Sequence, residues 1–301
     1  MSLPRIIAIV GPTGSGKSAL ALEAARRIDG EIVNADARQL YRGFEIGTGT
    51  PHGMRRPDGV LEVEGIAHRL YAEQDPRTSL TVVEWRDLAL ARIRDIASRR
   101  KTPILVGGTG LYVRAIIDNP QYPAVPPQDD WRAVQSERLL PDLVAELQEK
   151  DRAAAERVDL KNPRRVLRAL EVATFGDSSD PAFGPPFVKA VQVGIDWPRE
   201  ELYARVEANV DAMLRDGWMD EVRARMADGI SLDVPAWNAI GYRELRQVAE
   251  GERTFEDAVV AIKTASRHFA KRQLTWFRKD GRIRWISAPE EFSSALGAWA
   301  C

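Results

Sequence analysis

The sequence predicts an α/β fold in which helices flank a parallel sheet, and three observations support this prediction. Short apolar, β-branched runs alternate with helical patterns along most of the chain. The first of these runs leads directly into a glycine-rich loop and then into a helical pattern. A proline-rich stretch and a later Gly/Ser/Asp/Pro loop enclose a segment that is helical throughout. We therefore expect an α/β core at 1–117 and 188–301, ending in a basic helix, and a helical insertion domain at 118–187.

The glycine-rich loop is Gly11-Pro12-Thr13-Gly14-Ser15-Gly16-Lys17-Ser18, which matches G-x-x-x-x-G-K-[ST] in full. An apolar strand pattern at 6–10 precedes it and apolar residues at helical spacing follow it. Such glycines let successive backbone N–H groups turn inward around a phosphate group. Lys17 would add a positive charge, and Ser18 a hydroxyl ligand for Mg²⁺. The loop therefore predicts a P-loop NTPase-like fold with a di- or triphosphate site.

The second expected strand, at 31–34, brings Asp36 to the edge of the sheet. In a doubly wound sheet the carboxyl ends of the strands converge on the phosphate crevice, so Asp36 would be aimed at the ligand. An aspartate in this place also suits a helix N-cap. The residues alone leave both interpretations open.

A helix at 81–99 leads to a third buried strand at 103–106. This strand ends in Gly107-Gly108-Thr109-Gly110, where ATPases and GTPases of the P-loop class usually hold an aspartate for Mg²⁺. We expect the glycines to let the backbone approach a ligand closely and Thr109 to offer a hydroxyl. The alternative is an ordinary strand-to-helix turn. The missing acid argues against a motor or switch NTPase.

The insertion is expected to be helical over 131–172. Within it, Arg164, Arg165 and Arg168 fall inside five residues and could bind a phosphate backbone. A solvated helix face is the alternative.

After the insertion, the pattern predicts a strand at 190–195, helices at 200–226, 244–250 and 255–277, and a final strand at 283–286. The spacing assigns these residues to the buried side of the long helix: Phe255, Ala258, Val259, Ile262, Ala265 and Phe269.

Basic residues dominate the end of this helix and the segment that follows it. Between positions 263 and 284 the only acid is Asp280, whereas the basic residues are Lys263, Arg267, Lys271, Arg272, Arg278, Lys279, Arg282 and Arg284. Trp276 and Phe277 are interleaved with them. This combination fits a nucleic-acid backbone, with an ordinary charged helix face as the alternative.

Composition excludes several classes of protein. The single cysteine, Cys301, rules out a disulfide framework and a cysteine-built zinc site. No apolar run approaches the roughly 18 residues that a membrane helix requires, and the N-terminus lacks a signal-peptide pattern. We therefore expect a cytoplasmic protein that does not bind membranes. The net charge of −1 gives no global attraction to polyanions.

With these motifs together, the chain resembles the bacterial tRNA dimethylallyltransferases, the tRNA isopentenyltransferase family, over nearly its whole length. The matching stretches are 11–18, Asp36-Ala37-Arg38-Gln39 with the residues up to 43, 46–48, 75–76, 107–112, 164–171, 241–242 and 270–278. The Asp-x-x-Gln segment, the Gly-Gly-Thr turn and the Ala-Lys-Arg-Gln helix are together far more specific than the P-loop. Ala37 departs from the family, because a serine is usual there, and so does the Asp-Leu-Lys-Asn segment at 159–162.

The resemblance implies transfer of a dimethylallyl group from dimethylallyl diphosphate to the exocyclic amine of the adenosine adjacent to the tRNA anticodon. It implies that Asp36 is the general base, that Lys17 and Thr109 are catalytic, and that residues 11–18 with Arg205 hold the diphosphate. Ser18 would bind Mg²⁺, and we expect a monomer. The expected tRNA contacts are Asp36, Ala37, Arg38, Gln39, Thr109, Arg164, Arg165, Val166, Leu167, Arg168, Lys271 and Arg272.

The residues alone are also compatible with three other functions. A small-molecule kinase could use the same loop, and a related enzyme could prenylate free adenine nucleotides. A nucleotide-gated RNA-binding protein without catalysis would leave Asp36 idle.

Overall fold

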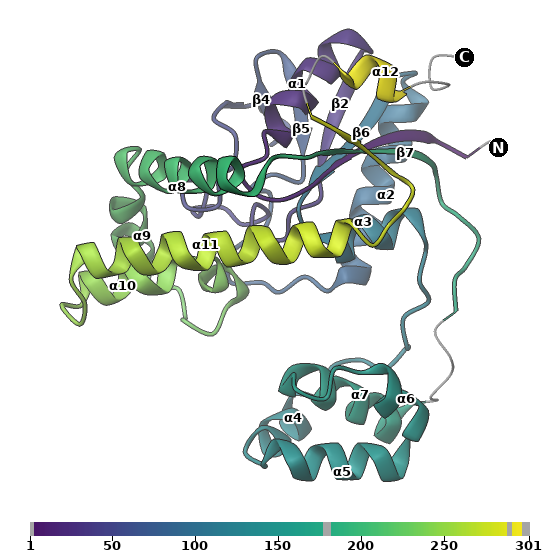
Figure 1. Cartoon of the computed structure of the whole chain (residues 1–301), viewed down its shortest axis with the longest axis vertical. Coiled ribbons are helices and arrows are strands. Elements are labelled where there is room, and N and C mark those ends of the chain that lie inside the picture. The colour runs from purple at the N-terminus through teal and green to yellow at the C-terminus, as the bar shows by residue number, and fades with distance from the viewer. Residues whose placement is uncertain (1–2, 177–181, 288–290, 297–301) are drawn as a thin grey trace. The chain divides into compact units, whose positions relative to one another are not determined.

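A parallel sheet and a separate helical unit divide the chain of this computed structural model between them, as Figure 1 shows. The structure describes residues 3–176, 182–287 and 291–296. Unit 1 comprises Met1–Asp118 and Pro186–Cys301, and unit 2 comprises Asn119–Pro185. These limits fall within two residues of those expected from the proline-rich boundaries. Residues 177–181 of the second predicted boundary loop lie outside the described residues.

The sheet of unit 1 contains, among the described residues, eight strands in the order β3-β4-β5-β2-β6-β1-β7-β8. They are β1 Arg5–Val10, β2 Gly30–Asn34, β3 Met54–Arg55, β4 Leu61–Val63, β5 Ile66–Arg69, β6 Thr102–Gly107, β7 Lys189–Ile195 and β8 Ile283–Ile286. Neighbouring strands pair in parallel except at β3–β4 and β4–β5. The predicted parallel sheet is confirmed, and a small antiparallel hairpin at its edge is added.

Helices cover both faces of this sheet. The helices of unit 1 are α1 Lys17–Arg27, α2 Val82–Ser98, α3 Gly110–Ile117, α8 Arg199–Arg215, α9 Trp218–Ala227, α10 Tyr242–Ala249, α11 Phe255–Phe277 and α12 Phe292–Leu296, with a 3₁₀ turn, η1, at Pro235–Asn238. Alternation along β1 sends Ile7 and Ile9 to the face under α1 and α12, and Ile6 and Ala8 to the face under α2 and α3. The P-loop strand is therefore buried on both sides in the middle of the sheet.

Two predictions about helices were wrong in detail. The helix predicted at 200–226 is two helices, α8 and α9, because Gly217 between them adopts a left-handed φ of 97°. Phe255, assigned to the buried side of α11, is the first residue of that helix and is 42% exposed. Buried positions further along α11 include Ala270 and Gln273.

Unit 2 has its own small core. Its helices are α4 Asp129–Ser136, α5 Leu140–Lys150, α6 Arg152–Arg157 and α7 Pro163–Phe175. The buried residues of this core are Leu143, Leu147, Ala155, Val166 and Leu170. Asn162 caps α7 by accepting the Arg165 amide, and Pro163 occupies the first helical turn, where proline is tolerated.

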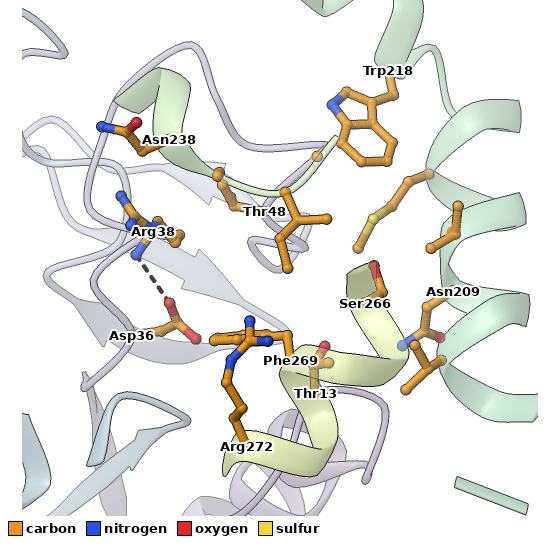
Figure 2. Close-up of a pocket in the computed structure, with 16 residues that line it drawn as sticks. Thr13, Asp36, Arg38, Thr48, Asn209, Trp218, Asn238, Ser266, Phe269 and Arg272 are labelled. Atoms are coloured by element: carbon orange, nitrogen blue, oxygen red, sulfur yellow. Dashed lines mark hydrogen bonds between the residues drawn. The ribbon is translucent and has the colours of Figure 1, made fainter. Parts of the chain in front are cut away.

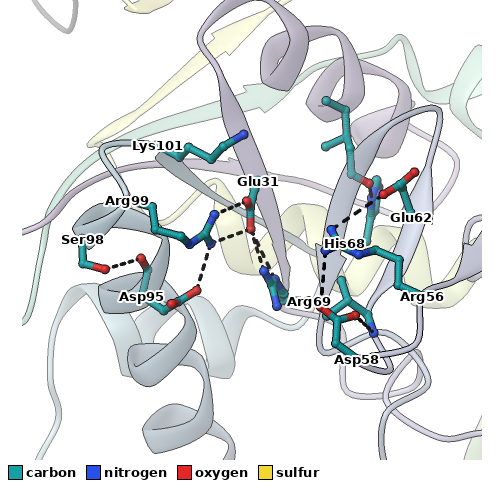
Figure 3. A network of polar contacts seen from close by, with 12 residues as sticks. Glu31, Arg56, Asp58, Glu62, His68, Arg69, Asp95, Ser98, Arg99 and Lys101 are labelled. Atoms are coloured by element: carbon teal, nitrogen blue, oxygen red, sulfur yellow. Dashed lines mark hydrogen bonds and ion pairs between the residues drawn. The ribbon is translucent and has the colours of Figure 1, made fainter.

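A buried carboxylate anchors β2, the strand that leads to Asp36. Glu31 is 5% exposed and accepts hydrogen bonds from Arg69 and Arg99, as Figure 3 shows. Burial alone would raise the pKa of Glu31, but the two guanidinium groups outweigh it and the pKa lies below its ordinary value.

Within the described ranges, none of the helices combines the length and apolarity that a membrane crossing requires.

Candidate functional site

The P-loop lies between the end of β1 and the start of α1, with its outward carbonyls held by side chains from elsewhere. Arg205 donates through Nε to the Gly14 carbonyl at 2.9 Å, and Trp197 donates through Nε1 to the Ser15 carbonyl at 3.0 Å. The Arg205 guanidinium also lies over the Trp197 ring, 4.4 Å from its centroid. Gly16 adopts a φ of 91°, a conformation that suits glycine. Because these contacts hold the carbonyls of Gly14 and Ser15 on the outer side of the loop, the backbone amides of the loop can face its inner side.

A polar group inside the loop lacks a partner. Ser15 is 1% exposed, and its hydroxyl makes no hydrogen bond with any described residue. The amides of Gly14, Gly16 and Lys17 also make no hydrogen bond with the described part of the chain. Since buried polar groups normally find partners, these donors fit an anionic ligand such as a diphosphate.

Lys17 is placed so that its charge is sensitive to its surroundings. Its ammonium group donates to the Pro12 carbonyl at 2.6 Å. Burial lowers the pKa of Lys17 to about 8, and the nearby Asp36 carboxylate opposes part of this shift. The interaction indicates that the P-loop lysine and Asp36 lie close together, as predicted from the strand ends.

Asp36 lies in a turn beyond β2. Asn34 is fully buried, accepts the Asp36 amide at 2.8 Å and donates to the carbonyls of Asp36 and Leu70. The Asp36 carboxylate in turn accepts the Arg38 amide at 2.9 Å. No helix begins here in the described chain, so the helix N-cap interpretation was wrong. The aspartate instead caps a turn with one oxygen, a common role for this residue.

Thr109 connects the end of β6 to the Asp36 turn. Its hydroxyl accepts the Ala37 amide at 3.0 Å, and its own amide donates to the Ala35 carbonyl at 3.1 Å. Thr109 is therefore close to the predicted base, but its oxygen already supports the turn.

The neighbouring glycines are closely packed against other parts of the protein, and an approach of a ligand to their backbone stays a prediction. A Cβ on Gly107 would lie 2.2 Å from the Ala35 backbone, one on Gly108 would lie 2.1 Å from the Gln273 side chain, and one on Gly110 would lie 2.0 Å from Trp276. The protein's own segments occupy the space that these glycines leave.

One pocket brings the P-loop and Asp36 together, with a volume of about 220 Å³. Figure 2 shows Asp36 with Arg38 on one side and Trp218 with Asn209 on the other, while Thr13 represents the P-loop. Much of the wall is apolar, and it comes from Val206, Val210, Met213, Trp218, Ala239, Ile240 and Phe269. Thr13 of the P-loop, the Asp36 carboxylate and an apolar wall therefore line one cavity.

Gln39, another predicted RNA contact, is used within the protein. Its amide group donates to the carbonyls of Thr48 and Gly49, and Arg38 donates to the Pro235 carbonyl. Glu221 holds the preceding turn by accepting the Ile46 amide at 2.8 Å. The Asp-x-x-Gln and Ile-Gly-Thr segments therefore form one wall of the pocket.

Most of the basic residues at the end of the chain have partners in unit 1. Lys263 pairs with Asp211 at 2.7 Å, Arg267 with Glu207, and Arg278 with Asp196 at 3.0 Å. Arg282 pairs with Asp118 and Asp280, and Arg284 donates to the Ala295 carbonyl. Within the described residues, Lys271, Arg272 and Lys279 have no acidic partner, and all three are exposed. The basic surface is thus smaller than the sequence suggests, but it retains both residues that we assigned to tRNA.

The arginine cluster of unit 2 separates into two groups. Arg164 and Arg165 are exposed. Arg168 instead bonds to Glu171, which is fully buried, and donates to the Val125 carbonyl at 2.9 Å. Val166 is also fully buried and Leu167 is half-buried. The assignment of Val166 as a tRNA contact was therefore wrong, since its side chain is part of the unit 2 core, and Arg168 is committed to Glu171.

Comparison with known families agrees with this arrangement. Residues 39–280 match the model of the IPP transferase family. The chain belongs to the IPP transferase family. A tRNA dimethylallyltransferase of Roseiflexus castenholzii is 41% identical over 281 residues, covering 91% of this chain and 90% of that protein. A protein of the same name from Pseudarthrobacter chlorophenolicus is 41% identical over 312 residues, covering 100% and 99%.

Solved structures of this family give the same result for the fold. The full-length tRNA isopentenylpyrophosphate transferase of Bacillus halodurans is 32% identical, covers 99% of this chain and 98% of its own, and superposes with a TM-score of 0.71. A eukaryotic dimethylallyltransferase acting on tRNA has a TM-score of 0.77 at 22% identity, covering 99% and 77%. At that identity, the second likeness supports the fold alone.

The predicted Mg²⁺ ligand of this IPP transferase, Ser18, lies exposed in the first turn of α1. The described residues contain no group of three or more His, Cys, Asp or Glu side chains arranged to hold a metal. A single hydroxyl beside a phosphate cradle does fit Mg²⁺, since this ion is commonly held by substrate phosphates and water with few protein ligands.

The sequence reasoning missed several residues that shape the site of this family member. Trp197 holds the Ser15 carbonyl of the P-loop, and Glu221 holds the amides of Ile46 and Gly47. These contacts join residues that are distant in the chain, so they leave no local pattern in the sequence. Gln273 was quoted only as part of a motif, although one signal was available. It is a polar residue at a position that the helical spacing of α11 directs toward the core.

Proposed function

We propose that this protein transfers the dimethylallyl group of dimethylallyl diphosphate to the exocyclic amine of the adenosine next to the anticodon of tRNA, acting as a monomer. One observation carries the proposal: Thr13 of the P-loop and the Asp36 carboxylate line the same partly apolar pocket. The names of the relatives supply the class of donor and acceptor. A kinase would not need an apolar wall between its phosphate cradle and its carboxylate.

The leaving group is the first requirement of this reaction. The allylic C–O bond breaks, its electron pair goes to the diphosphate, and negative charge grows on the departing oxygens. The free amides of Gly14 and Gly16, the Ser15 hydroxyl and Lys17 are fixed donors for that charge. When bound at Ser18, Mg²⁺ would neutralise further charge on the diphosphate.

The acceptor amine is the second requirement. The lone pair of an adenine amine is delocalised into the ring, so the amine attacks well only if a base removes its proton as the new C–N bond forms. One Asp36 oxygen is used by the Arg38 amide, and the carboxylate borders the pocket. The adenine must leave its stack to reach this group, as bases do in other enzymes that modify them.

The apolar wall suits the five-carbon donor. Val206, Val210, Met213 and Phe269 offer no hydrogen-bonding groups to the prenyl chain. They bury apolar surface and keep water away from an allylic carbon that would otherwise be hydrolysed.

RNA docking would use the basic residues that have no acidic partner. On α11 these are Lys271 and Arg272, with Lys279 just beyond it, and the exposed Trp276 lies among them. Exposed aromatic rings and free cations together suit unpaired nucleotides. In unit 2 the exposed Arg164 is a further candidate for contacts to phosphates, and so is Arg165, although it lies 3.9 Å from the Asp159 carboxylate.

The decisive experiment supplies labelled dimethylallyl diphosphate with tRNA, AMP or ATP and follows the label. We expect label only in tRNA, at one adenosine of the anticodon loop, and no phosphoryl transfer from ATP. Lys17→Ala should reduce the rate at least about 100-fold, as loss of a single oxyanion donor does elsewhere. Label in AMP or ATP, or full activity in the Lys17→Ala variant, would contradict the proposal.

A further inference from the structure

Gln273 joins two loops of the site that belong to different strands. It is 5% exposed on α11, and its Oε1 accepts the Thr13 amide of the P-loop at 2.8 Å. Its Nε2 donates to the Gly108 carbonyl, in the turn after β6, at 2.9 Å. The orientation of the amide is fixed by its partners, because an N–H can only donate and a carbonyl can only accept.

Each loop leads directly to a reacting group. Thr13 is four residues from Lys17 in the P-loop. Gly108 precedes Thr109, whose hydroxyl accepts the Ala37 amide beside Asp36. Gln273 is therefore one bridge between the cradle for the leaving group and the turn that carries the base.

The space around the bridge is filled. A Cβ on Gly108 would lie only 2.1 Å from Gln273 Nε2. The side-chain amide therefore packs against the backbone of Gly108, and any residue other than glycine at position 108 would displace it. The bridge also satisfies the Thr13 amide and removes it from the donors available to the diphosphate.

We propose that Gln273 is a positioning residue, which sets the distance between the diphosphate cradle and the Asp36 carboxylate. This inference rests on the proposed function, since that spacing matters only if the leaving group and the base act in the same step. Gln273 is polar where the core of α11 is apolar, and no apolar or ionised side chain of similar length can both accept and donate here. The neighbouring Lys271 and Arg272 face solvent, so one helix positions the site and offers charge to RNA.

The consequence is a loss of rate rather than of binding. Each loop would keep its own internal contacts without the bridge, so both substrates should still bind. Their reacting atoms would be aligned less well, and misplacement by about 1 Å can cost roughly 100-fold in rate.

The test measures kcat and the two KM values for a series of variants. Gln273→Met removes both contacts at similar length. Gln273→Glu keeps an acceptor for the Thr13 amide but brings an oxygen to the Gly108 carbonyl. We expect kcat to fall about 10–100-fold in both variants while each KM stays within about threefold. Thr275→Ala is the matched control, because this exposed threonine on the same helix bonds only to the Lys271 carbonyl.

Two further measurements separate positioning from general destabilisation. Gly108→Ala should displace the Gln273 amide, so its effect on kcat should be non-additive with that of Gln273→Met. Hydrogen exchange should quicken at 11–18 and at 35–38 in Gln273→Met and stay unchanged in β7 and α1 beyond its first turn. Because exchange needs no substrate, it tests the bridge even if the wild-type chain failed to modify tRNA, which would instead overturn the proposed function. Wild-type kcat in Gln273→Met, additive effects with Gly108→Ala, or unchanged exchange in both loops would overturn the inference.

Discussion

Three neighbouring residues hold Asp36 in place, and one of them, Asn34, is the last residue of β2. Asn34 holds its backbone on one side, Thr109 holds the next amide through its hydroxyl, and the Arg38 amide occupies one carboxylate oxygen. The carboxylate is thereby fixed at the pocket with its second oxygen unbonded by any described residue. A group held in this way loses little freedom when a substrate binds, which favours its use as a base.

Asp36→Asn retains the shape of the side chain and the bond from the Arg38 amide, but it cannot take a proton. We expect kcat to fall by about 10²–10⁴-fold with little change in the KM for dimethylallyl diphosphate. Single-turnover kinetics with labelled donor and tRNA would measure this directly. A variant that keeps the wild-type rate would leave Asp36 as a turn residue only.

Lys17 predicts a pH dependence. Burial lowers its pKa to about 8, so the free enzyme loses this positive charge as the pH rises through that value. The contribution of Lys17 to diphosphate attraction is therefore full well below pH 8 and declines as the pH rises through that value, so kcat/KM for the donor should decline on the alkaline side. Arginine keeps its charge throughout this range, so whatever activity Lys17→Arg retains should lack the decline. The same decline in that variant would assign it to another group.

At the scale of the element, β2 shows how a strand can be fixed at its start for a function at its end. Glu31 accepts from Arg69 Nη2 at 3.1 Å and from Arg99 Nη2 at 2.9 Å (Figure 3). These side chains come from β5 and from the end of α2, so the carboxylate fastens β2 to both neighbours. A buried charge of this kind is costly unless it is fully paired.

Glu31→Gln should lower the free energy of unfolding by about 2–4 kcal/mol at pH 7, because two guanidinium groups lose their anion. The pKa of Glu31 is lower in the folded protein than in the unfolded chain, where it is near 4.3. The stabilisation by the ionised carboxylate is therefore complete above about pH 4.3, and it is lost as the pH falls through the pKa of the folded protein. Urea unfolding of both proteins from pH 7 downward should therefore show the two stabilities converging in acid. A constant difference at all pH values would exclude the ionised carboxylate as the cause.

Helix α11 illustrates why counting charges in a sequence overstates a binding surface. Lys263 and Arg267 lie on its side toward α8, where Asp211 and Glu207 neutralise them. Lys271 follows after a further turn and has no acidic partner in the described chain. Helix packing, which decides which residues meet, separates paired from unpaired cations on one element.

Lys271→Ala should raise the KM for tRNA and reduce the slope of log affinity against log salt by about 1, while leaving donor binding unchanged. Lys263→Ala removes the same charge from the same helix, but at a residue already paired with Asp211, so we expect little effect. Affinities measured across a salt series would compare them. Equal effects of the two variants would argue against α11 as the RNA-binding face.

At the scale of the whole molecule, the two units have separate cores of very different size. The sheet of unit 1 is buried on both faces, whereas unit 2 has a handful of buried apolar residues around Leu147. A small core supplies less stabilisation per residue, so unit 2 should open more readily than unit 1.

Leu147→Ala creates a cavity in the unit 2 core, where Leu147 is fully buried. We expect a cost of about 2–5 kcal/mol confined to that unit. Hydrogen exchange should quicken across the helices α5 and α7 and stay unchanged in β1 and β6. Faster exchange in the central strands as well would show that the two units unfold together.

The outline of the fold could be read from the sequence, and so could the residues that we propose as the chemical centre of the site. The P-loop, the strands around it and Asp36 are local patterns, since phosphate-binding glycines and apolar periodicity depend on nearby residues. The β3–β4 hairpin was not predicted, because its strands are too short to show an alternating apolar pattern. The break at Gly217 was not predicted, because the sequence does not show which φ a glycine within a helical pattern adopts.

The sequence by itself determined what kind of groups this protein brings to a reaction: a phosphate cradle, a carboxylate and a supply of positive charge. Only the tertiary structure decided which of them are free to act. It committed Arg168 and Arg267 to acids, buried Val166, filled the space beside Gly107 and Gly108 with protein, and placed Gln273 between two loops. The physical reason is that pairing, burial and steric contact depend on residues distant in the chain, which only packing brings together.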